Sequence, residues 1–314
     1  MTRVACIGEC MIELKQAEGG LYARGYGGDT LNTAIYLARL GADVDYFTAL
    51  GDDPMSDEMI AGWIAEGVGT SRVARLKGKL PGLYMIQTDA FGDRRFFHWR
   101  ESAAARILMD LPETGDILDS LASYDVIYLS AITLSIYSAQ GRVKLIGTLH
   151  RARKRGAIVA FDTNFRARGW PDPDVARAVF AEAFAASDIV LASTEDLLPL
   201  YPDESDGQLL ERISCDEIVL KHLRPGSIVL SKGVSREVAA EPATRPVVDT
   251  TAAGDSFAAA YIAARLAGAE PFEAAQAGHR LGGVVVCYPG AIIPRSAMPP
   301  DILTDPPPSR KGSR

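Results

Sequence analysis

Residues 249–268 read DTTAAGDSFAAAYIAARLAG, a small-residue turn followed by a helix. In the second half, apolar residues recur at helical spacing from Phe257 to Leu266, and Gly268 is a suitable stop. The first half leaves its backbone N–H groups open directly before the helix, and the free amides and dipole of a helix N-terminus attract anions. The stretch therefore predicts an anion site at Ala252, Ala253 and Gly254.

Asp255 stands inside this predicted anion site, where a carboxylate would compete with a bound phosphate. One interpretation gives it a chemical role, in which it accepts a proton from a hydroxyl while the amides hold the phosphoryl group in transfer. The other makes it only the N-cap of the helix. The residues by themselves leave both interpretations open.

A second motif, GGDTLNTA at residues 27–34, opens the helical pattern IYLARLG. The two glycines allow a close approach of the backbone, and Asp29 and Asn32 place polar groups at the helix entrance. Gly28, Asp29 and Asn32 thus suit a ligand with several hydroxyl groups. The alternative is a plain Gly-Gly turn with Asp29 or Thr30 as N-cap.

Short β-branched runs alternate with helical segments along the chain, which predicts an α/β protein whose mostly parallel sheet has helices on both faces. The expected strands are residues 4–14, 44–50, 126–131, 158–162, 189–192 and 218–221. The expected helices are residues 30–40, 57–66, 141–155, 174–186 and 208–213.

Two stretches break the alternation. Residues 12–28 are Gly-rich without a helix, and residues 82–100 form a hairpin pattern whose arms, 83–88 and 95–100, flank a turn with Gly92 and Asp93. We expect a small β-element that projects as a lid. The alternative is an ordinary extension of the main sheet.

Composition limits the function classes. The chain has 314 residues, 47% of them apolar, and a formal net charge of −7, which disfavours a dedicated nucleic-acid partner. The N-terminus does not have the pattern of a signal peptide, and no apolar run reaches the ~20 residues of a membrane span. Four cysteines do not make a disulfide framework. We expect a protein of the reducing cytoplasm without a membrane partner.

In this order, the two motifs resemble the signature regions of the ribokinase/PfkB family of carbohydrate kinases. Within the family the chain is most similar to the 2-keto-3-deoxygluconate kinase branch, through IGECMIEL, GGDTLNTAIYLARLG, FHWRESAAAR, DTTAAGDSFAAAYIAARLAG and YPGAIIPRSAMP. The resemblance implies a ribokinase-like three-layer α/β/α sandwich with a small β-sheet lid. It implies one kinase domain at 1–300, a lid from about 12–28 and 82–100, and a flexible tail at 301–314.

The resemblance also assigns roles at the sugar end. Asp255 matches the catalytic base and residues 252–254 match the anion hole, although Gly is commoner at Ala252. Gly28 and Asp29 match the substrate loop, while Tyr84, His98 and Arg100 match lid positions over the sugar. Arg100 is the expected ligand of a substrate carboxylate, because a guanidinium fork suits an acid; the alternative is an exposed edge charge. Glu13 sits where ribokinases carry a sugar-binding acid.

For the nucleotide, Asn164 and Arg166 follow a strand end, where ligands bind in open parallel sheets. Either Arg166 or Arg168 would stabilise the charge of the phosphoryl group in transfer. Glu195 matches the acid of an Asn-x-x-Glu stretch whose Asn is Ala192 here. The expected neighbours of ribose and adenine are Lys221, Arg224, Gly226 and His279, the last with a helix-surface histidine as its alternative.

The resemblance implies ATP-dependent phosphorylation of 2-dehydro-3-deoxy-D-gluconate at its C6 hydroxyl. Mg²⁺ would be held largely by ATP and water, with no metal cage of protein side chains. The alternatives are a fructokinase or ribokinase of the same fold, or a non-catalytic regulator that binds a sugar acid. Relatives form dimers or larger assemblies, so a homodimer or higher homo-oligomer is expected.

Overall fold

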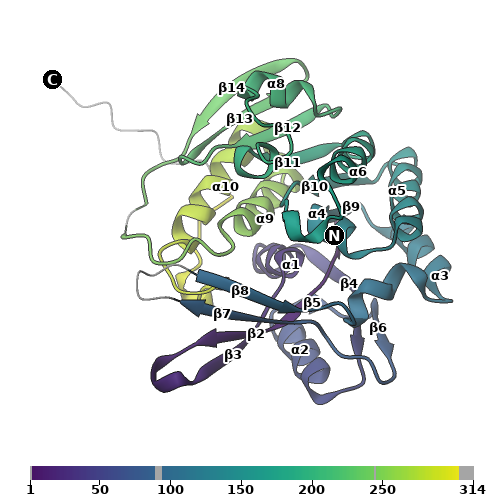
Figure 1. The fold of residues 1–314 in the computed structure, drawn as a ribbon. Helices are drawn as coiled ribbons and strands as arrows, with labels where there is room; N and C mark the ends of the chain where they lie inside the picture. Colours follow the sequence, from purple (N-terminus) through teal and green to yellow (C-terminus); the bar gives the residue numbers. More distant parts are fainter. Residues whose placement is uncertain (1, 89–93, 244, 304–314) are drawn as a thin grey trace.

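A computed structural model describes residues 2–88, 94–243 and 245–303. Within these residues a ten-stranded sheet runs through the centre of the protein, in the order β14-β13-β12-β11-β10-β9-β1-β4-β5, with β6 paired to β4 (Figure 1). The pairs from β12 to β5 are parallel, and the β12–β13 and β13–β14 pairs are antiparallel. The strand bounds are β1 Arg3–Ile7, β4 Asp43–Gly51, β5 Val68–Gly69, β6 Val73–Leu76, β9 Val126–Ser130, β10 Ile158–Asp162, β11 Ile189–Ser193, β12 Glu217–Lys221, β13 Gly226–Ser231 and β14 Val234–Ala239.

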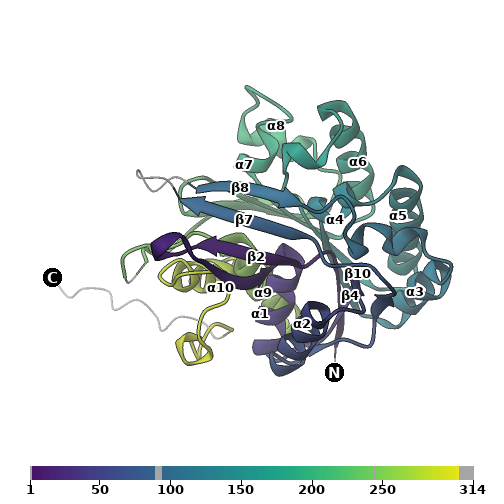
Figure 2. The ribbon, with the colours of Figure 1, turned by 60° about the horizontal axis from the view of Figure 1, so that its bottom comes forward.

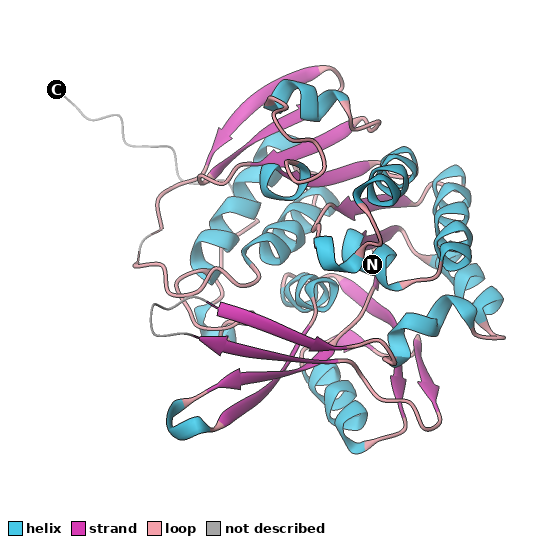
Figure 3. Cartoon of the chain, viewed as in Figure 1, coloured by secondary structure: helices cyan, strands magenta, loops and turns pink. Residues whose placement is uncertain are grey.

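Helices cover both faces of this sheet, as the alternation predicts (Figure 3). Their bounds are α1 Asp29–Arg39, α2 Pro54–Ala65, α3 Thr114–Ser120, α4 Ala131–Ile136, α5 Ala139–Lys154, α6 Pro173–Ala185, α7 Thr194–Leu197, α8 Asp206–Glu211, α9 Ala253–Leu266 and α10 Pro271–Val285. Each face has its own apolar core. One packs α5 and α6 against the sheet, and the other packs α1, α9 and α10 against the opposite face. The three-layer architecture is therefore confirmed.

A second sheet of four strands forms the predicted lid, in the order β3-β2-β7-β8 (Figure 2). Its strands are β2 Met11–Gln16, β3 Tyr22–Gly27, β7 Leu83–Thr88 and β8 Arg94–Trp99. Residues 11–27 and 83–99 are far apart in sequence, and the parallel pairing of β2 with β7 joins them. The alternative, an extension of the main sheet, is wrong. The hairpin turn at Gly92 and Asp93 lies outside the described residues, as does 304–314 of the predicted tail.

The prediction of a single strand over residues 4–14 is wrong. The run divides into β1 of the central sheet and β2 of the lid, with a break at residues 8–10. At this break Gly8 lies against α1, where a Cβ would be 2.0 Å from Thr30 Oγ1, and the polar Glu9 beside it is buried. The chain leaves the central sheet at this break and enters the lid, so the break forms the root of the lid.

Other boundaries agree with the sequence to within about three residues, which is the usual scatter at element ends. Among the described residues, no helix is both long enough and apolar enough to cross a bilayer. The division into one kinase domain and a tail stays a prediction.

Candidate active site

The turn of the 249–255 motif has the open geometry that an anion site needs. Helix α9 begins at Ala253, and its N-cap Ala252 has φ 61° and ψ 16°, in the left-handed region. Asp249 holds the turn by accepting hydrogen bonds from the backbone N–H groups of Thr251 and Gly290, each at 3.0 Å. The first-turn amides of a helix have no acceptor within the helix, so those of Gly254 and Asp255 can face an anion. The left-handed φ also explains why glycine suits position 252.

Asp255 is the third residue of α9, so its interpretation as a mere N-cap is wrong. Its side chain is buried and accepts a hydrogen bond from Asn32 Nδ2 at 2.8 Å. Burial raises the pKa of Asp255 well above its usual value; Asp29 and Asp162 add to the rise, while Asn32 and Lys221 oppose it. A carboxyl group of raised pKa is a stronger base once ionised, which suits proton abstraction near neutral pH.

The 27–34 motif places α1 against α9. Gly28 occupies the N-cap position and Asp29 is the first helical residue, so the alternative with Asp29 or Thr30 as N-cap is wrong. Asp29 Oδ2 accepts a hydrogen bond from Asn164 Nδ2 at 2.8 Å, which joins this helix to the loop after β10. The structure therefore brings Asp29, Asn32, Asn164 and Asp255 together.

The glycine pair makes room for the lid. A Cβ at Gly27 would lie 2.1 Å from the Tyr84 hydroxyl, and one at Gly28 would lie 2.2 Å from the carbonyl oxygen of Glu9. Any larger residue would push the lid away from the substrate loop. The two glycines are thus required for close approach.

The inner face of the lid carries a row of rings. Tyr84 stacks on His98 at 5.9 Å between centroids, and Phe96 stacks on His98 at 6.4 Å. Tyr84 also donates a hydrogen bond to Glu13 Oε2 at 2.5 Å, which joins Glu13 of β2 to the rings. Partial burial lowers the pKa of His98, and the guanidinium groups of Arg100 and Arg168 lower it further. Both cations therefore lie near the rings.

Arg100 is not an exposed edge charge. Its side chain is 19% exposed and forms an ion pair with Glu9, whose side chain is 1% exposed. Burial raises the pKa of the Glu9 carboxyl, and the Arg100 guanidinium opposes that rise. Sequence reasoning missed Glu9, and its one available signal was a charged residue inside an apolar strand pattern.

The loop after β10 is ordered by Asp196, which sequence reasoning also missed. Asp196 accepts hydrogen bonds from Thr163 Oγ1 and from the backbone N–H of Phe165, both at 2.9 Å. Arg166 lies 3.4 Å from the same carboxylate, and Arg168 reaches the carbonyl oxygen of Phe96 on the lid.

Glu195, the acid expected at the nucleotide, is exposed, whereas Asp196 is buried. Within the described part of the chain, only Asp196 of these two neighbouring acids contacts the loop after β10. The role of Glu195 at the nucleotide stays a prediction. Asp196 also pairs with Ser193, whose Oγ donates a hydrogen bond to Asp196 Oδ2 at 2.7 Å.

Lys221 lies near the start of α9. Its ammonium is 3.5 Å from Asp162 Oδ1 and would lie 3.7 Å from a Cβ at Gly254. Asp162, at the end of β10, is buried, and this burial raises its pKa. The ammonium therefore lies beside the predicted anion hole, and its expected place at the ribose stays a prediction.

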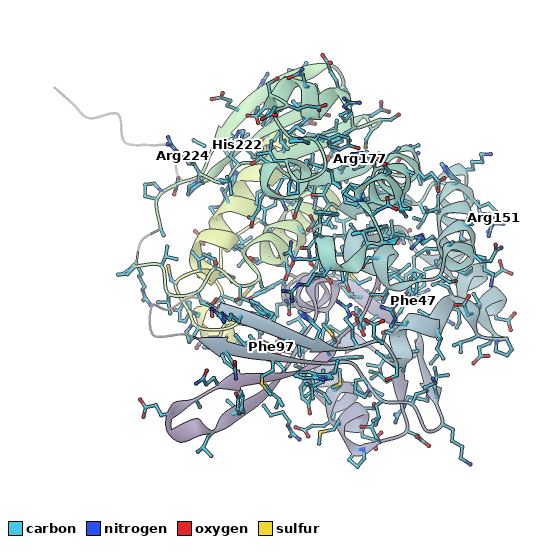
Figure 4. All side chains as sticks on the ribbon, in the orientation of Figure 1. Phe47, Phe97, Arg151, Arg177, His222 and Arg224 are labelled. Atoms are coloured by element: carbon cyan, nitrogen blue, oxygen red, sulfur yellow. The ribbon has the colours of Figure 1, made fainter. Side chains whose placement is uncertain are left out.

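The other residues predicted for the nucleotide lie at or near the turn between β12 and β13. Arg224 is exposed in this turn and Gly226 has φ 148°, a conformation that favours glycine (Figure 4). His279 of α10 bonds to Ser227 Oγ at 3.0 Å and packs edge-on against Phe257. Burial, with help from Lys221 and His222, lowers the pKa of His279 to about 4. His279 is therefore a neutral, packed side chain and not a helix-surface histidine.

Together these groups can bind an anion at open amides beside an ammonium, with a buried carboxylate within the same helical turn. The model of the pfkB family carbohydrate kinases matches residues 1–298. The chain belongs to this family. Its sequence and fold place it among carbohydrate kinases, and the roles of single residues remain predictions.

Several curated relatives of this kinase share most of its length. A 2-dehydro-3-deoxygluconokinase of Dickeya dadantii is 43% identical over 94% of this chain and 98% of its own. The enzyme of the same name from Escherichia coli K12 is 39% identical over 95% and 99%. Fructokinases are more distant, with that of Vibrio alginolyticus 28% identical over 84% of each chain.

Solved structures share the fold. A 2-dehydro-3-deoxygluconokinase from Thermotoga maritima superposes with a TM-score of 0.78 at 22% identity, covering 93% of this chain and 96% of its own. A fructokinase from Xylella fastidiosa with bound ATP gives a TM-score of 0.79 at 22% identity and covers 95% of each chain. The ribokinase-like fold predicted from the sequence is thereby confirmed.

Proposed function

We propose that this pfkB-family kinase transfers the γ-phosphoryl group of ATP to the C6 hydroxyl of 2-dehydro-3-deoxy-D-gluconate. The observation that carries this proposal is the identity of 36–43%, over nearly the whole chain, with curated 2-dehydro-3-deoxygluconokinases. The site supports it chemically, because it combines a base, an anion hole and a lid that carries a buried cation.

Asp255 is the proposed general base. Its carboxylate accepts the proton of the C6 hydroxyl as the oxygen attacks the γ-phosphorus and the bond to the β-phosphate oxygen breaks. Asn32 holds one carboxylate oxygen, at 2.8 Å, and leaves the other for the substrate. The raised pKa of Asp255 makes this proton transfer favourable near neutral pH.

The phosphoryl group in transfer would lie against the amides of Gly254 and Asp255, because the amide of Ala253 donates to the carbonyl oxygen of Thr250 at 3.2 Å. Lys221 adds a positive charge above Gly254, and Arg166 supports the nucleotide phosphates from the loop after β10. Mg²⁺ neutralises charge on the β- and γ-phosphates when it binds with ATP. Asp162, buried at the carboxyl end of β10, is the side chain that we expect to face its water ligands.

The sugar acid would lie between the substrate loop and the inner face of the lid. Gly28 and Asp29 contact its hydroxyl groups, Tyr84 and His98 cover it, and Arg100 binds its carboxylate. We assign the ADP moiety to the region of Arg224, Gly226 and His279. Closure of the lid would exclude water from the transfer step and so limit wasteful hydrolysis of ATP.

We further infer that the kinase works in the cytoplasm as a homodimer or larger homo-oligomer. The outer face of the lid carries Phe97 and Trp99, which are 42% and 58% exposed, with Leu83 and Met85 opposite them in register. A second copy would cover this apolar face. Light scattering of wild type and Trp99→Lys tests the assembly, since the variant is expected to dissociate.

An ADP-release assay with 2-dehydro-3-deoxygluconate, fructose, ribose and tagatose 6-phosphate tests the proposed reaction. The sugar acid is expected to give the highest kcat/KM. A preference for fructose or ribose would assign the enzyme to another branch of the family. Tight binding of the acid without ADP release would instead indicate a regulator.

A further inference from the structure

The root of the lid contains a buried ion pair between two segments of the chain. Glu9 stands at the break between β1 and β2, and Arg100 follows the last residue of β8. Arg100 Nη2 donates to Glu9 Oε2, and the two residues are 91 positions apart. The pair therefore joins the entry of the lid to its exit.

The two partners differ in freedom. Glu9 is enclosed: a Cβ at Gly82 would lie 2.9 Å from its Oε1, and a Cβ at Gly28 would lie 2.2 Å from its carbonyl oxygen. The Arg100 side chain is 19% exposed and the Glu9 side chain is 1% exposed, so Arg100 is the more accessible partner of the pair. Among the described residues, Glu9 Oε1 and Arg100 Nε have no hydrogen-bond partner.

We propose that Glu9 is a positioning residue for the acid substrate and fixes the Arg100 guanidinium in the orientation that binds the sugar carboxylate. This inference rests on the proposed function, in which the substrate is a sugar acid. Arg100 has five N–H donors and contacts Glu9 through Nη2, so the donors of Nη1 remain for a second carboxylate. Glu9 contacts Arg100 rather than the sugar.

The physical reason is preorganisation. A free arginine side chain occupies many rotamers and loses that freedom when it binds a ligand, whereas an arginine held in place has already lost it. Glu9 also reduces the net positive charge of Arg100, which weakens its attraction for an anion. We infer that orientation outweighs this loss, because the buried Glu9 holds Nη2 in place and leaves Nη1 for the substrate carboxylate.

The first test is Glu9→Gln, which keeps the shape of the side chain and removes its charge. We expect KM for the sugar acid to rise about 5- to 10-fold, because a neutral acceptor holds a guanidinium less firmly. We expect kcat and KM for ATP to change less than about twofold, since the carboxylate contact is the same in the ground and transition states. Glu204→Gln, which alters the surface pair with Arg212, is the matched control.

The second test displaces Glu9 without removing its charge. In Gly82→Ala the new methyl group meets the Glu9 carboxylate and the Met11 side chain, so we expect the same rise in KM for the acid. Gly62→Ala, on the exposed face of α2 with no atom within 4 Å of its Cβ, is the control. In an Arg100→Leu background, Glu9→Gln should leave KM for the acid unchanged, since no guanidinium remains to be oriented.

Several results would overturn the inference. A lower KM for the acid in Glu9→Gln would show that Glu9 competes with the substrate, and an unchanged KM would show that it does not orient Arg100. A further rise in the Arg100→Leu background would show that Glu9 acts independently. If the wild type neither binds nor phosphorylates the acid, the proposed function and this inference both fail. If the wild type phosphorylates the acid but a variant gives one of these three KM results, only the inference fails.

Discussion

The phosphate end and the sugar end of the site differ in burial: Asp255 at the first is 9% exposed, whereas Phe96 on the inner face of the lid is 42% exposed. They also differ in how the chain forms them. The phosphate end is formed mainly by one continuous stretch, residues 249–257, fixed between α1 and α10. The sugar end is formed by four strands from two separate stretches of the chain. Burial therefore dominates the chemistry of the first, and pairing between distant residues dominates that of the second.

Burial shifts pKa values at both ends of the site. Asp255 and Asp162 lie at the buried end, and burial is the main cause of the raised pKa of each. On the inner face of the lid, partial burial lowers the pKa of His98, and burial with the Glu13 carboxylate raises the pKa of the Tyr84 hydroxyl. The two ends therefore differ in the groups that burial affects, which are carboxylates at the phosphate end and an imidazole and a phenol on the lid.

Asp255→Asn tests the chemical role of the buried end. We expect kcat to fall by about 10²–10⁴-fold, because the general base is lost. The melting temperature should be kept, since Asn removes a buried charge without changing shape. In the wild type, we expect the acidic limb of the pH–rate profile to lie above the ordinary pKa of Asp. This limb should disappear in the variant. Near-normal turnover would contradict the assignment of Asp255 as base.

Lys221→Met tests whether the ammonium belongs to the phosphate end. We expect kcat/KM for ATP to fall about 10- to 100-fold, which corresponds to one charge-assisted hydrogen bond of about 1.5–3 kcal/mol. Steady-state kinetics with Lys154→Met, on the exposed end of α5, provide the comparison. An effect on KM for the sugar alone would place Lys221 at the wrong end of the site.

Arg100→Leu tests the lid. We expect KM for the acid to rise about 10-fold with a smaller change in kcat, and the preference over neutral sugars to fall. The variant should also lose about 3–5 kcal/mol of unfolding free energy, because Glu9 is left as an uncompensated buried charge. Arg95→Leu, on the outer face of the same strand, should show neither effect. Unchanged discrimination between acid and neutral sugars would remove Arg100 from the specificity role.

His279→Gln tests the nucleotide side through pH. The pKa of His279 is about 4 in the folded protein and its ordinary value is 6.5, so the unfolded chain takes up a proton that the folded chain does not. Stability is therefore lost as pH falls from about 6.5 toward 4, by on the order of 1–2 kcal/mol at pH 5. Urea unfolding at pH 7 and pH 5 should show that the variant loses less unfolding free energy between these two pH values than the wild type does. An equal loss in both proteins would contradict the lowered pKa.

Ala252→Gly tests the backbone of the anion hole. Ala252 adopts φ 61°, which costs an alanine about 1 kcal/mol and a glycine almost nothing. We expect thermal unfolding to show a gain in stability of up to about 1 kcal/mol, with kcat within about twofold of the wild type. A loss of stability would indicate that the left-handed conformation does not persist.

The sequence by itself determined the features that depend on near neighbours. Apolar residues at helical or alternating spacing predicted about half of the strands and the helices α1, α2, α5, α6, α8 and α9 to within a few residues, but not β13, β14 or α10. Small residues before Asp255 predicted the open turn of α9. These features follow from backbone preferences and from the period of each element, and both are local properties.

Only the tertiary structure decided which distant residues meet. It divided residues 4–14 between two sheets, paired Glu9 with Arg100, placed Lys221 over Gly254, and chose Asp196 rather than Glu195 for the loop after β10. Each outcome depends on how separate elements pack, and packing fixes which polar groups lose water and must find a partner. The free energy of that pairing arises only when residues far apart in sequence are brought together, so no local pattern records it.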